Sequence, residues 1–461
     1  MAAPRVAVVG GGVSGLTAAY QLRRELPEAR IDVHEASSRI GGALQTADFP
    51  SGPVDVGAEA FIVRRPEARE LVRELGLDDA VRHPGGRSSA ILTGGRLEPM
   101  PTGTFMGLPS DVRSLSGVLT SDEAARASRE EERPLKWVPG ADVSLGGLVA
   151  ERFGPAVVDR LVDPMLGGVY AAPSSGLGLR EVVPGLAAAL DRGAPTLTAA
   201  VRQLVGPGTP SPVFASLTGG YRVLVDALAE AAGARLHPRS ECTSIDRTPR
   251  GYALTVRGGT GQSTPTADLV VVAVPAPRAA PLLHGVGGLD TAAAALSEIR
   301  TASSALVALE LDRSVDLPGQ SGVLVATDEP VPFKAMTFTS SKWPHLDTRP
   351  GHLVRVSFGR LGDDEVLAAA DDELVEMAVS GLAGIIGRRP VVLHSRVRRW
   401  DDALAEIGPG HSRRIGRIRA ELAERTPGLE LVGGATEGVG VPACIGSARA
   451  AAHRLARKWQ D

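Results

Sequence analysis

The chain has 461 residues, 43% of them hydrophobic and 22% charged, a balance typical of a soluble globular protein with two or three domains. Its formal net charge of −3 offers no strong field for nucleic acid or for an anionic membrane surface. With only two cysteines, Cys242 and Cys444, the chain cannot be a disulfide scaffold, and the two cannot form a zinc or iron–sulfur site by themselves. No apolar run approaches the ~20 residues that span a bilayer. We therefore expect a cytoplasmic protein.

The chain begins with the pattern of a dinucleotide-binding unit. Val6–Val9 is a short apolar run, typical of a buried parallel strand. Gly10, Gly12 and Gly15 then have the spacing G-x-G-x-x-G, which allows a tight turn, a close approach to a pyrophosphate and close packing of helix on strand. A helix over about 13–26 would present its N-terminal N–H groups to the phosphates.

A second strand is predicted at 31–35, and it ends in Glu35 about twenty residues after the glycine turn. A carboxylate at this place accepts hydrogen bonds from ribose hydroxyls. An isolated G-x-G-x-x-G is a weak signal, but strand, turn, helix, strand and acid in this order predict a dinucleotide site. The expected cofactor contacts here are Gly10, Gly11, Gly12, Val13, Ser14, Gly15, Glu35 and Ala36.

A basic, glycine-rich segment follows the acid directly, where a plain NAD-binding domain would continue into a helix. An arginine beside glycines can offer a charged fork and open backbone to the second part of a long cofactor. Residues 35–42 are E-A-S-S-R-I-G-G and match the pattern E-A-x-x-R-x-G-G. The chain thus resembles the FAD-dependent amine oxidase and protoporphyrinogen oxidase superfamily, which implies FAD as the cofactor, with Arg39 and Gly42 among its contacts.

Two later segments extend the resemblance. Residues 267–275 (ADLVVVAVP) are similar to the strand by which that superfamily re-enters its FAD domain. Residues 431–442 (LVGGATEGVGVP) resemble the loop that passes under the flavin, and a helix over 443–452 would follow. The resemblance implies further cofactor contacts at Val56, Gly57, Ala58, Glu59, Cys242, Trp400, Gly434, Gly440, Val441 and Pro442. Cys242 is expected to be a small apolar core residue and not a reactive thiol.

These motifs predict an α/β fold: a Rossmann-like FAD-binding domain with an inserted helical region and an antiparallel-sheet substrate domain. Because the FAD motifs are far apart in the chain, the FAD-binding domain should be discontinuous, comprising 1–59, 214–278 and 395–461. The expected substrate-binding domain comprises 60–100, 190–213 and 279–394, and the helical insertion 101–189.

Periodicity within the insertions supports this division. Apolar residues at helical spacing between 145 and 161 predict a packing face in preference to a membrane-docking face. The charged stretch 121–136 is expected to be a solvated surface helix or a mobile loop. Alternating runs at 303–311, 321–327, 334–340 and 353–359 predict an antiparallel sheet with one covered face, suited to walling a substrate cavity.

A narrower resemblance points to the bacterial porphyrinogen oxidases. It rests on residues 57–65 (GAEAFIVRR), 167–171 (GGVYA), 214–220 (FASLTGG) and 337–345 (TFTSSKWPH), and it covers essentially the whole chain in order. It implies oxidation of a porphyrinogen to a porphyrin in haem biosynthesis, in three two-electron steps that use O2 and release H2O2. No catalytic acid–base pair is expected, because the flavin carries the chemistry.

A flat tetrapyrrole with propionates requires apolar walls and a few cationic anchors. Arg64 and Arg65 are the predicted carboxylate anchors; the alternative is a solvent-facing helix start before Pro66. Lys334, within an apolar strand, is a weaker candidate, and Gly168 would allow the backbone to approach the ring. The adjacent arginines and the absence of a membrane-docking stripe favour the tetracarboxylate coproporphyrinogen III over the dicarboxylate protoporphyrinogen IX.

Several alternatives remain open at this stage. An amine oxidase would stack its substrate between aromatic rings, and this chain has only 3% aromatic residues. A carotenoid-type desaturase would need a longer apolar tunnel. An FAD-binding regulator without turnover is supported only by residues 405–407 (AEI), where most members have Pro-Gln-Tyr. A downstream ferrochelatase as partner and peripheral membrane contact also stay open.

Overall fold

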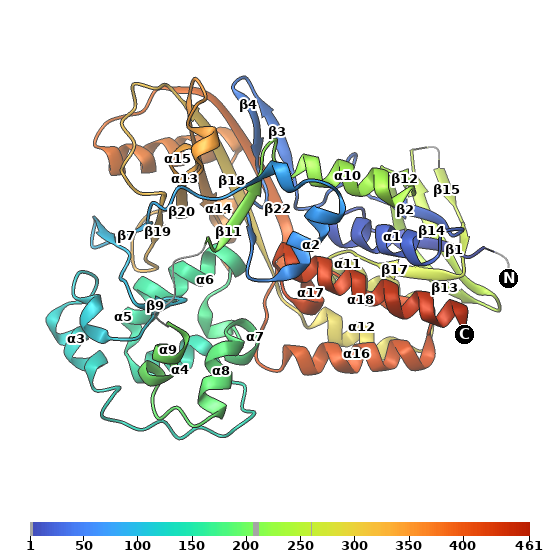
Figure 1. Cartoon of the computed structure of the whole chain (residues 1–461), viewed down its shortest axis with the longest axis horizontal. Coiled ribbons are helices and arrows are strands. Elements are labelled where there is room, and N and C mark those ends of the chain that lie inside the picture. The colour runs from blue at the N-terminus through green and yellow to red at the C-terminus, as the bar shows by residue number, and fades with distance from the viewer. Residues whose placement is uncertain (1–2, 206–211, 260) are drawn as a thin grey trace.

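The computed structural model describes residues 3–205, 212–259 and 261–461. Three regions lie side by side (Figure 1): a parallel sheet with its helices, a second sheet of long strands, and a cluster of short helices coloured cyan to green. The chain passes between these regions several times. Among the described residues no helix is both long and apolar enough to cross a membrane.

The first region is built on a five-stranded parallel sheet. Its strands, in spatial order, are β12 (Arg235–His237), β2 (Arg30–His34), β1 (Arg5–Val9), β17 (Leu269–Val272) and β23 (Leu429–Leu431). Alternate side chains of β1 enter two different cores, as the two-residue period of a strand requires. Val6 and Val8 pack with one set of helices, whereas Ala7 and Val9 pack with the elements on the opposite face.

Helices cover one face of this sheet, and a meander with further helices covers the other. The covering helices of the first face are α1 (Val13–Glu25), α10 (Arg222–Ala232) and α18 (Val441–Gln460), and α1 and α18 lie side by side (Figure 1). The second face is covered by β13 (Ser240–Thr248), β14 (Gly251–Gly258), β15 (Gly261–Ser263), β16 (Thr266–Ala267), α11 (Ala276–Gly285), α12 (Asp290–Ser297) and α16 (His411–Arg425). This two-sided burial explains why β17 is fully buried and apolar throughout.

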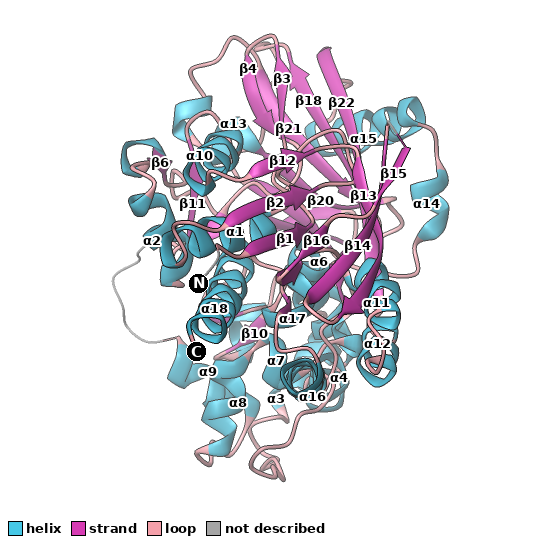
Figure 2. Cartoon of the chain, turned by 90° about the vertical axis from the view of Figure 1, so that its right-hand side faces the viewer, coloured by secondary structure: helices cyan, strands magenta, loops and turns pink. Residues whose placement is uncertain are grey.

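The second region is a seven-stranded sheet. Its spatial order is β22 (Val392–Ala405), β18 (Thr301–Leu311), β21 (His352–Phe358), β20 (Phe333–Phe338), β19 (Gly322–Val325), β7 (Ala90–Thr93) and β8 (Arg96–Pro99). The four strands predicted from alternation are present and antiparallel to one another, and only β19 and β7 pair in parallel. One face packs against α15 (Asp371–Ile386), and the hairpin β3 (Thr46–Phe49) and β4 (Gly52–Asp55) packs against the other. Figure 2 shows this hairpin beside β18 and β22.

The third region contains the predicted helical packing face. Its helices are α3 (Ser121–Ser128), α4 (Leu145–Arg152), α5 (Pro155–Val157), α6 (Asp163–Tyr170), α7 (Leu179–Val182), α8 (Pro184–Asp191) and α9 (Leu197–Leu204), with a π-helical turn at Val158–Val162. Most of the predicted apolar positions are buried, namely Leu145, Val149, Phe153, Val157, Val158 and Leu161, and Leu148 is partly buried. The apolar stripe is therefore part of the core of this region.

The charged stretch 121–136 differs in part from the expectation of a solvated surface. Glu130 is completely buried, and its carboxylate accepts hydrogen bonds from the backbone N–H of Leu197 at 2.7 Å and from the Thr198 hydroxyl at 2.7 Å. Arg152 lies 3.2 Å from the same carboxylate. Glu130 therefore satisfies the free N–H groups at the start of α9, a long-range role that local charge patterning does not reveal.

We expect Glu130→Ala to lower the free energy of unfolding by about 3 kcal/mol or more, because it leaves Arg152 buried without its counter-charge and removes the acceptor at α9. Thermal unfolding of the purified protein measures the effect. Glu131→Ala is the matched control, since Glu131 pairs with Arg202 at the surface and should contribute less than about 1 kcal/mol. Equal losses in the two variants would contradict the role of Glu130.

Candidate cofactor and substrate site

The glycine turn after β1 has no room for a side chain at Gly10 or Gly15. Gly10 has φ +106°, and its N–H donates to the His34 carbonyl at 2.8 Å, which ties the ends of β1 and β2 together. A Cβ on Gly15 would lie 1.9 Å from the Gly10 carbonyl oxygen. The helix α1 therefore starts directly on the strand end, with its first N–H groups beside the turn, as a pyrophosphate site requires.

The second glycine pair lies against the first turn. The Gly41 N–H donates to the Gly11 carbonyl at 2.7 Å, and a Cβ on Gly42 would lie 3.0 Å from the Cα of Gly12. Both Gly41 and Gly42 have positive φ, which favours glycine. The two turns thus present bare backbone to the same space, and this arrangement fits a dinucleotide diphosphate.

Glu35 and Arg39 lie on either side of these turns. The Glu35 carboxylate accepts the N–H of Gly11 at 2.8 Å and the N–H of Ser37 at 2.8 Å, which fixes it at the end of β2 with further lone pairs available to ribose hydroxyls. Arg39 donates to the Gly42 carbonyl at 2.7 Å, and within the described ranges no carboxylate oxygen lies within 4 Å of its guanidinium. Burial lowers the pKa of Arg39, because it disfavours the charged guanidinium. An anion bound beside Arg39 would offset this cost and would therefore be favoured.

The closing segment follows β23. It consists of α17 (Gly434–Glu437), a short turn through Gly440 and the helix α18, which has Pro442 in its first turn. The predicted helix over 443–452 is confirmed, and it is longer at both ends than expected. Buried hydroxyls of Thr436 and Ser447 lie 2.8 Å apart and join α17 to α18. Because the N-terminus of a helix carries a partial positive charge, the start of α18 can favour negative charge on a ligand placed there.

The turn Val56–Glu59 is held by hydrogen bonds from several elements. The N–H of Val56 donates to the Gln45 carbonyl at 2.8 Å, and the N–H of Ala58 donates to the Ala43 carbonyl at 3.1 Å. The Trp400 indole N–H donates to the Val56 carbonyl at 3.1 Å. The predicted contacts of the turn and of Trp400 are thus brought together in one place.

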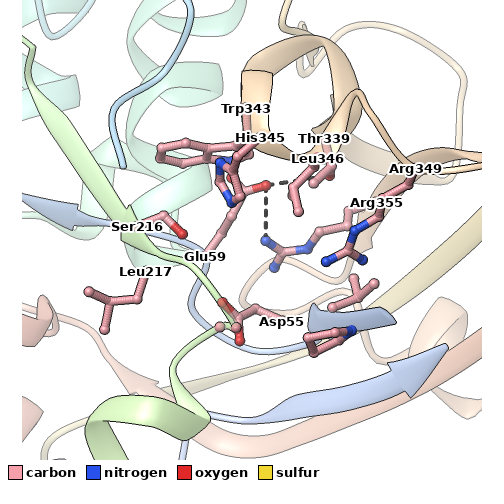
Figure 3. A pocket seen from close by; sticks show the side chains of 14 residues that line it. Asp55, Glu59, Ser216, Leu217, Thr339, Trp343, His345, Leu346, Arg349 and Arg355 are labelled. Carbon is pink, nitrogen blue, oxygen red and sulfur yellow. Dashed lines mark hydrogen bonds and ion pairs between the residues drawn. The ribbon is translucent and has the colours of Figure 1, made fainter. Parts of the chain in front are cut away.

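Glu59 is bound to the seven-stranded sheet region. Its carboxylate lies 2.5 Å from Nζ of Lys342 and 3.3 Å from the guanidinium of Arg355, and the Thr339 hydroxyl donates to it at 3.4 Å. Burial alone would raise the pKa of Glu59, but Lys342 and Arg355 more than offset it and lower the pKa to about 2. Its side chain therefore stays ionised and is directed toward the sheet (Figure 3).

Asp55 lies across a small cavity from Arg349 and Arg355 (Figure 3). The cavity encloses about 20 Å³, room for one water molecule. Asp55 accepts hydrogen bonds from the Thr46 hydroxyl at 2.6 Å and from the Tyr221 N–H at 3.0 Å, yet burial raises its pKa to about 6. The sequence did not predict that Asp55, Arg349 and Arg355 lie around one cavity. The one available signal was a charged residue, Arg355, inside the apolar strand LVRVSFG.

The predicted substrate anchors lie at the start of α2 (Pro66–Glu74), after the short strand β5 (Phe61–Ile62). Arg64 and Arg65 are both exposed. Arg65 pairs with Glu67 at 2.7 Å, whereas Arg64 has no such partner in the part of the chain that the structure describes. Gly168, in α6, faces open space, so a ligand could approach its backbone closely.

Two further predicted residues lie in different surroundings: Lys334 is buried and Cys242 is partly buried. Lys334 donates from Nζ to the Gly359 carbonyl at 2.7 Å, and burial, followed by the charge of Arg360, lowers its pKa to about 8. Its strand β20 packs against α6, the helix that contains Gly168. For Cys242, burial raises the pKa of the thiol to about 12, which agrees with an unreactive packing residue.

The sequence model of the flavin-containing amine oxidoreductases matches residues 13–456. The chain belongs to this family. Two relatives named coproporphyrinogen III oxidase are each 43% identical: that of Mycobacterium tuberculosis (96% of this chain and 95% of that protein) and that of Mycobacterium leprae (97% of each). A solved structure described as a putative protoporphyrinogen oxidase from Exiguobacterium sp. 255-15 is 27% identical and superposes with a TM-score of 0.89, over 99% of this chain and all of that one.

Membership of the flavin-containing amine oxidoreductases confirms the predicted FAD cofactor and the mixed α/β fold. The two glycine turns, Glu35 and Arg39 fit the diphosphate and ribose of that cofactor. A cyclohexylamine oxidase from Brevibacterium oxydans has the same fold at 16% identity and a TM-score of 0.73, over all of both chains, which is a likeness of fold alone.

We expect Asp55→Asn to stabilise the protein at pH 8. The folded-state pKa of Asp55, about 6, lies above the ordinary value, so folding disfavours the ionised carboxylate; this cost is complete above pH 6 and disappears as the pH falls toward 4. The gain should reach at most about 3 kcal/mol at pH 8 and shrink by about half at pH 5. Thermal unfolding at the two pH values measures it.

Glu59→Gln serves as the comparison for Asp55→Asn and should have the opposite sign. The pKa of Glu59 is lowered to about 2, so the ionised carboxylate contributes stability above its ordinary pKa, and that contribution is lost as the pH falls toward 2. A loss of stability in Asp55→Asn that is equal at pH 8 and pH 5 would contradict a raised pKa for Asp55, because the effect would then not follow its titration.

Proposed function

We propose that the protein catalyses the FAD-dependent oxidation of coproporphyrinogen III to coproporphyrin III, with O2 as the final acceptor and H2O2 as the product. The observation that carries the proposal is the 43% identity over 96% of the chain to a protein named coproporphyrinogen III oxidase. A protoporphyrinogen IX oxidase is the second candidate, because the similar solved structure is described as a putative protoporphyrinogen oxidase.

The surroundings of Arg64 and Arg65 support a carboxylated, largely apolar substrate. Ile62 and Phe214 are paired on adjacent strands, and they remain 38% and 40% exposed. The strand that contains Ile62 leads directly into Arg64 and Arg65, so this apolar pair lies beside the two cations in the chain. Apolar walls with a few cations are what a tetrapyrrole with propionates needs.

In the proposed mechanism the chain's own residues bind and orient, and no acid–base pair is assigned. Bound FAD would supply the two-electron oxidising chemistry of each step, with O2 as the final acceptor. Arg64 and Arg65 would hold carboxylates, and the backbone at Gly168 would let the ring lie close to α6. Lys334 would be a weaker anchor, because its Nζ already donates a hydrogen bond to the Gly359 carbonyl.

The remaining cofactor contacts are also part of this proposal. They are the residues of the glycine turns, the turn Val56–Glu59, the Cys242 backbone, Trp400, and Gly434, Gly440, Val441 and Pro442 in the closing segment. We further propose the division into a discontinuous FAD-binding domain, a substrate-binding domain and a helical insertion, a cytoplasmic location, and a downstream ferrochelatase as a partner that receives the porphyrin.

Anaerobic bleaching of the flavin tests the substrate. The purified protein is mixed with coproporphyrinogen III or protoporphyrinogen IX, and porphyrin fluorescence is followed after air is admitted. We expect faster bleaching by the tetracarboxylate. Faster bleaching by protoporphyrinogen IX would select the second candidate, and no bleaching by either would leave only the flavoprotein fold, with amines as the next substrates to try.

Arg64→Ala and Arg65→Ala test the anchors. Each should raise KM for coproporphyrinogen III by roughly tenfold, since a charge-assisted hydrogen bond contributes about 1.5 kcal/mol, with a smaller change in kcat. Arg73→Ala, an exposed arginine in the last turn of α2, is the matched control and should leave KM unchanged. Unchanged KM in both anchor variants would remove these residues from the substrate site.

A further inference from the structure

Two side chains of the seven-stranded sheet donate to consecutive carbonyl groups of the turn Val56–Glu59. The Trp400 indole N–H, from β22, reaches the Val56 carbonyl at 3.1 Å. A guanidinium N–H of Arg355, from β21, reaches the Gly57 carbonyl at 2.5 Å. The two donors come from strands that are not neighbours in the chain, but both flank β18.

The turn is closely packed at Gly57. A Cβ on Gly57 would lie 2.0 Å from the Ala43 carbonyl oxygen and 2.9 Å from the indole of Trp400, so no side chain fits between the segment before β3 and the sheet. Arg355 has a side chain that is only 9% exposed, and the charge of Glu59 holds it at 3.3 Å. The geometry therefore leaves one position for the two carbonyls.

We propose that Arg355 and Trp400 are positioning residues through which the seven-stranded sheet fixes the turn Val56–Glu59 against the flavin. This inference rests on the cofactor contacts proposed above for the turn. A preorganised backbone at a flavin favours one distribution of charge on the ring, so a shift of the turn changes how strongly oxidised and reduced FAD are bound. The sheet thus acts on the redox properties of the cofactor through the turn, in addition to the direct contact proposed for Trp400.

Arg355→Lys separates position from charge. A lysine keeps the positive charge, but its single ammonium cannot reproduce the fork that reaches both Gly57 and Glu59. The stronger attraction is to the Glu59 carboxylate, so the Gly57 carbonyl loses its donor. Trp400→Phe is the second variant: it removes the indole N–H that donates to the Val56 carbonyl and keeps a smaller aromatic ring at this position.

Arg349→Lys is the matched control. Arg349 lines the same cavity as Arg355 and is also partly buried, yet it donates no hydrogen bond to the turn in the described structure (Figure 3). A general loss of packing or charge in the cavity would affect this variant and Arg355→Lys alike. If Arg355 positions the turn, only Arg355→Lys should change the properties of the bound flavin.

The measurements are the FAD affinity of the apoprotein and the reduction potential of the bound flavin, both without substrate. We expect Arg355→Lys and Trp400→Phe to change the ratio of affinities for oxidised and reduced FAD by about tenfold, a shift of about 30 mV for a two-electron couple. Arg349→Lys should keep the wild-type values. If Arg355→Lys does not fold, Trp400→Phe against wild type decides by the same readout.

Two results would overturn the inference: wild-type potentials in Arg355→Lys and Trp400→Phe, or equal shifts in all three variants. Neither depends on the substrate. If the wild-type protein oxidises neither porphyrinogen but the two variants shift the potential, the positioning role stands and the proposed substrate fails. If the wild-type protein oxidises coproporphyrinogen III and the variants match its potential, only the positioning role fails.

Discussion

The ion pairs of Glu59 join the turn after the hairpin of β3 and β4 to the seven-stranded sheet region. Lys342 and Arg355 belong to the seven-stranded sheet region, and Glu59 directly follows the hairpin of β3 and β4. Burying such charges costs several kcal/mol per ion, so the cluster gives little net stability over an apolar contact of the same shape. The cluster instead specifies how the hairpin sits on the sheet. Removing one member leaves the other charges buried without a counter-charge, and only one arrangement of hairpin and sheet pairs Glu59 with both Lys342 and Arg355.

Local sequence signals predicted the parts of the fold that depend on neighbouring residues. The glycine turns could be predicted because close approach of backbone atoms excludes every other residue type within a span of a few positions. Four strands of the seven-stranded sheet, β18 to β21, could be predicted from alternation, since one face packs on α15 and the other meets the hairpin. The apolar spacing in α4 and the turn that follows likewise predicted a buried face.

The rest could not be predicted because its partners are distant in the chain. Glu59 and Lys342 are 283 positions apart, and Arg355 and Gly57 are 298 apart. Glu130 lies in a stretch so rich in charge that a solvated surface is the natural expectation, and only the approach of α9 from 67 positions away makes it a buried cap. A single sequence contains no local periodicity that reports such pairs.

The hairpin of β3 and β4 has a consequence for exchanging parts between members of the family. By sequence it belongs with the dinucleotide motif, but its apolar side chains pack on the second sheet and its turn is held by donors from that sheet. The segment exchanged between family members should therefore contain more than one sheet by itself. A chimera that takes the seven-stranded sheet from a relative would need to bring residues 46–59 with it, or the graft would meet a turn shaped for a different partner.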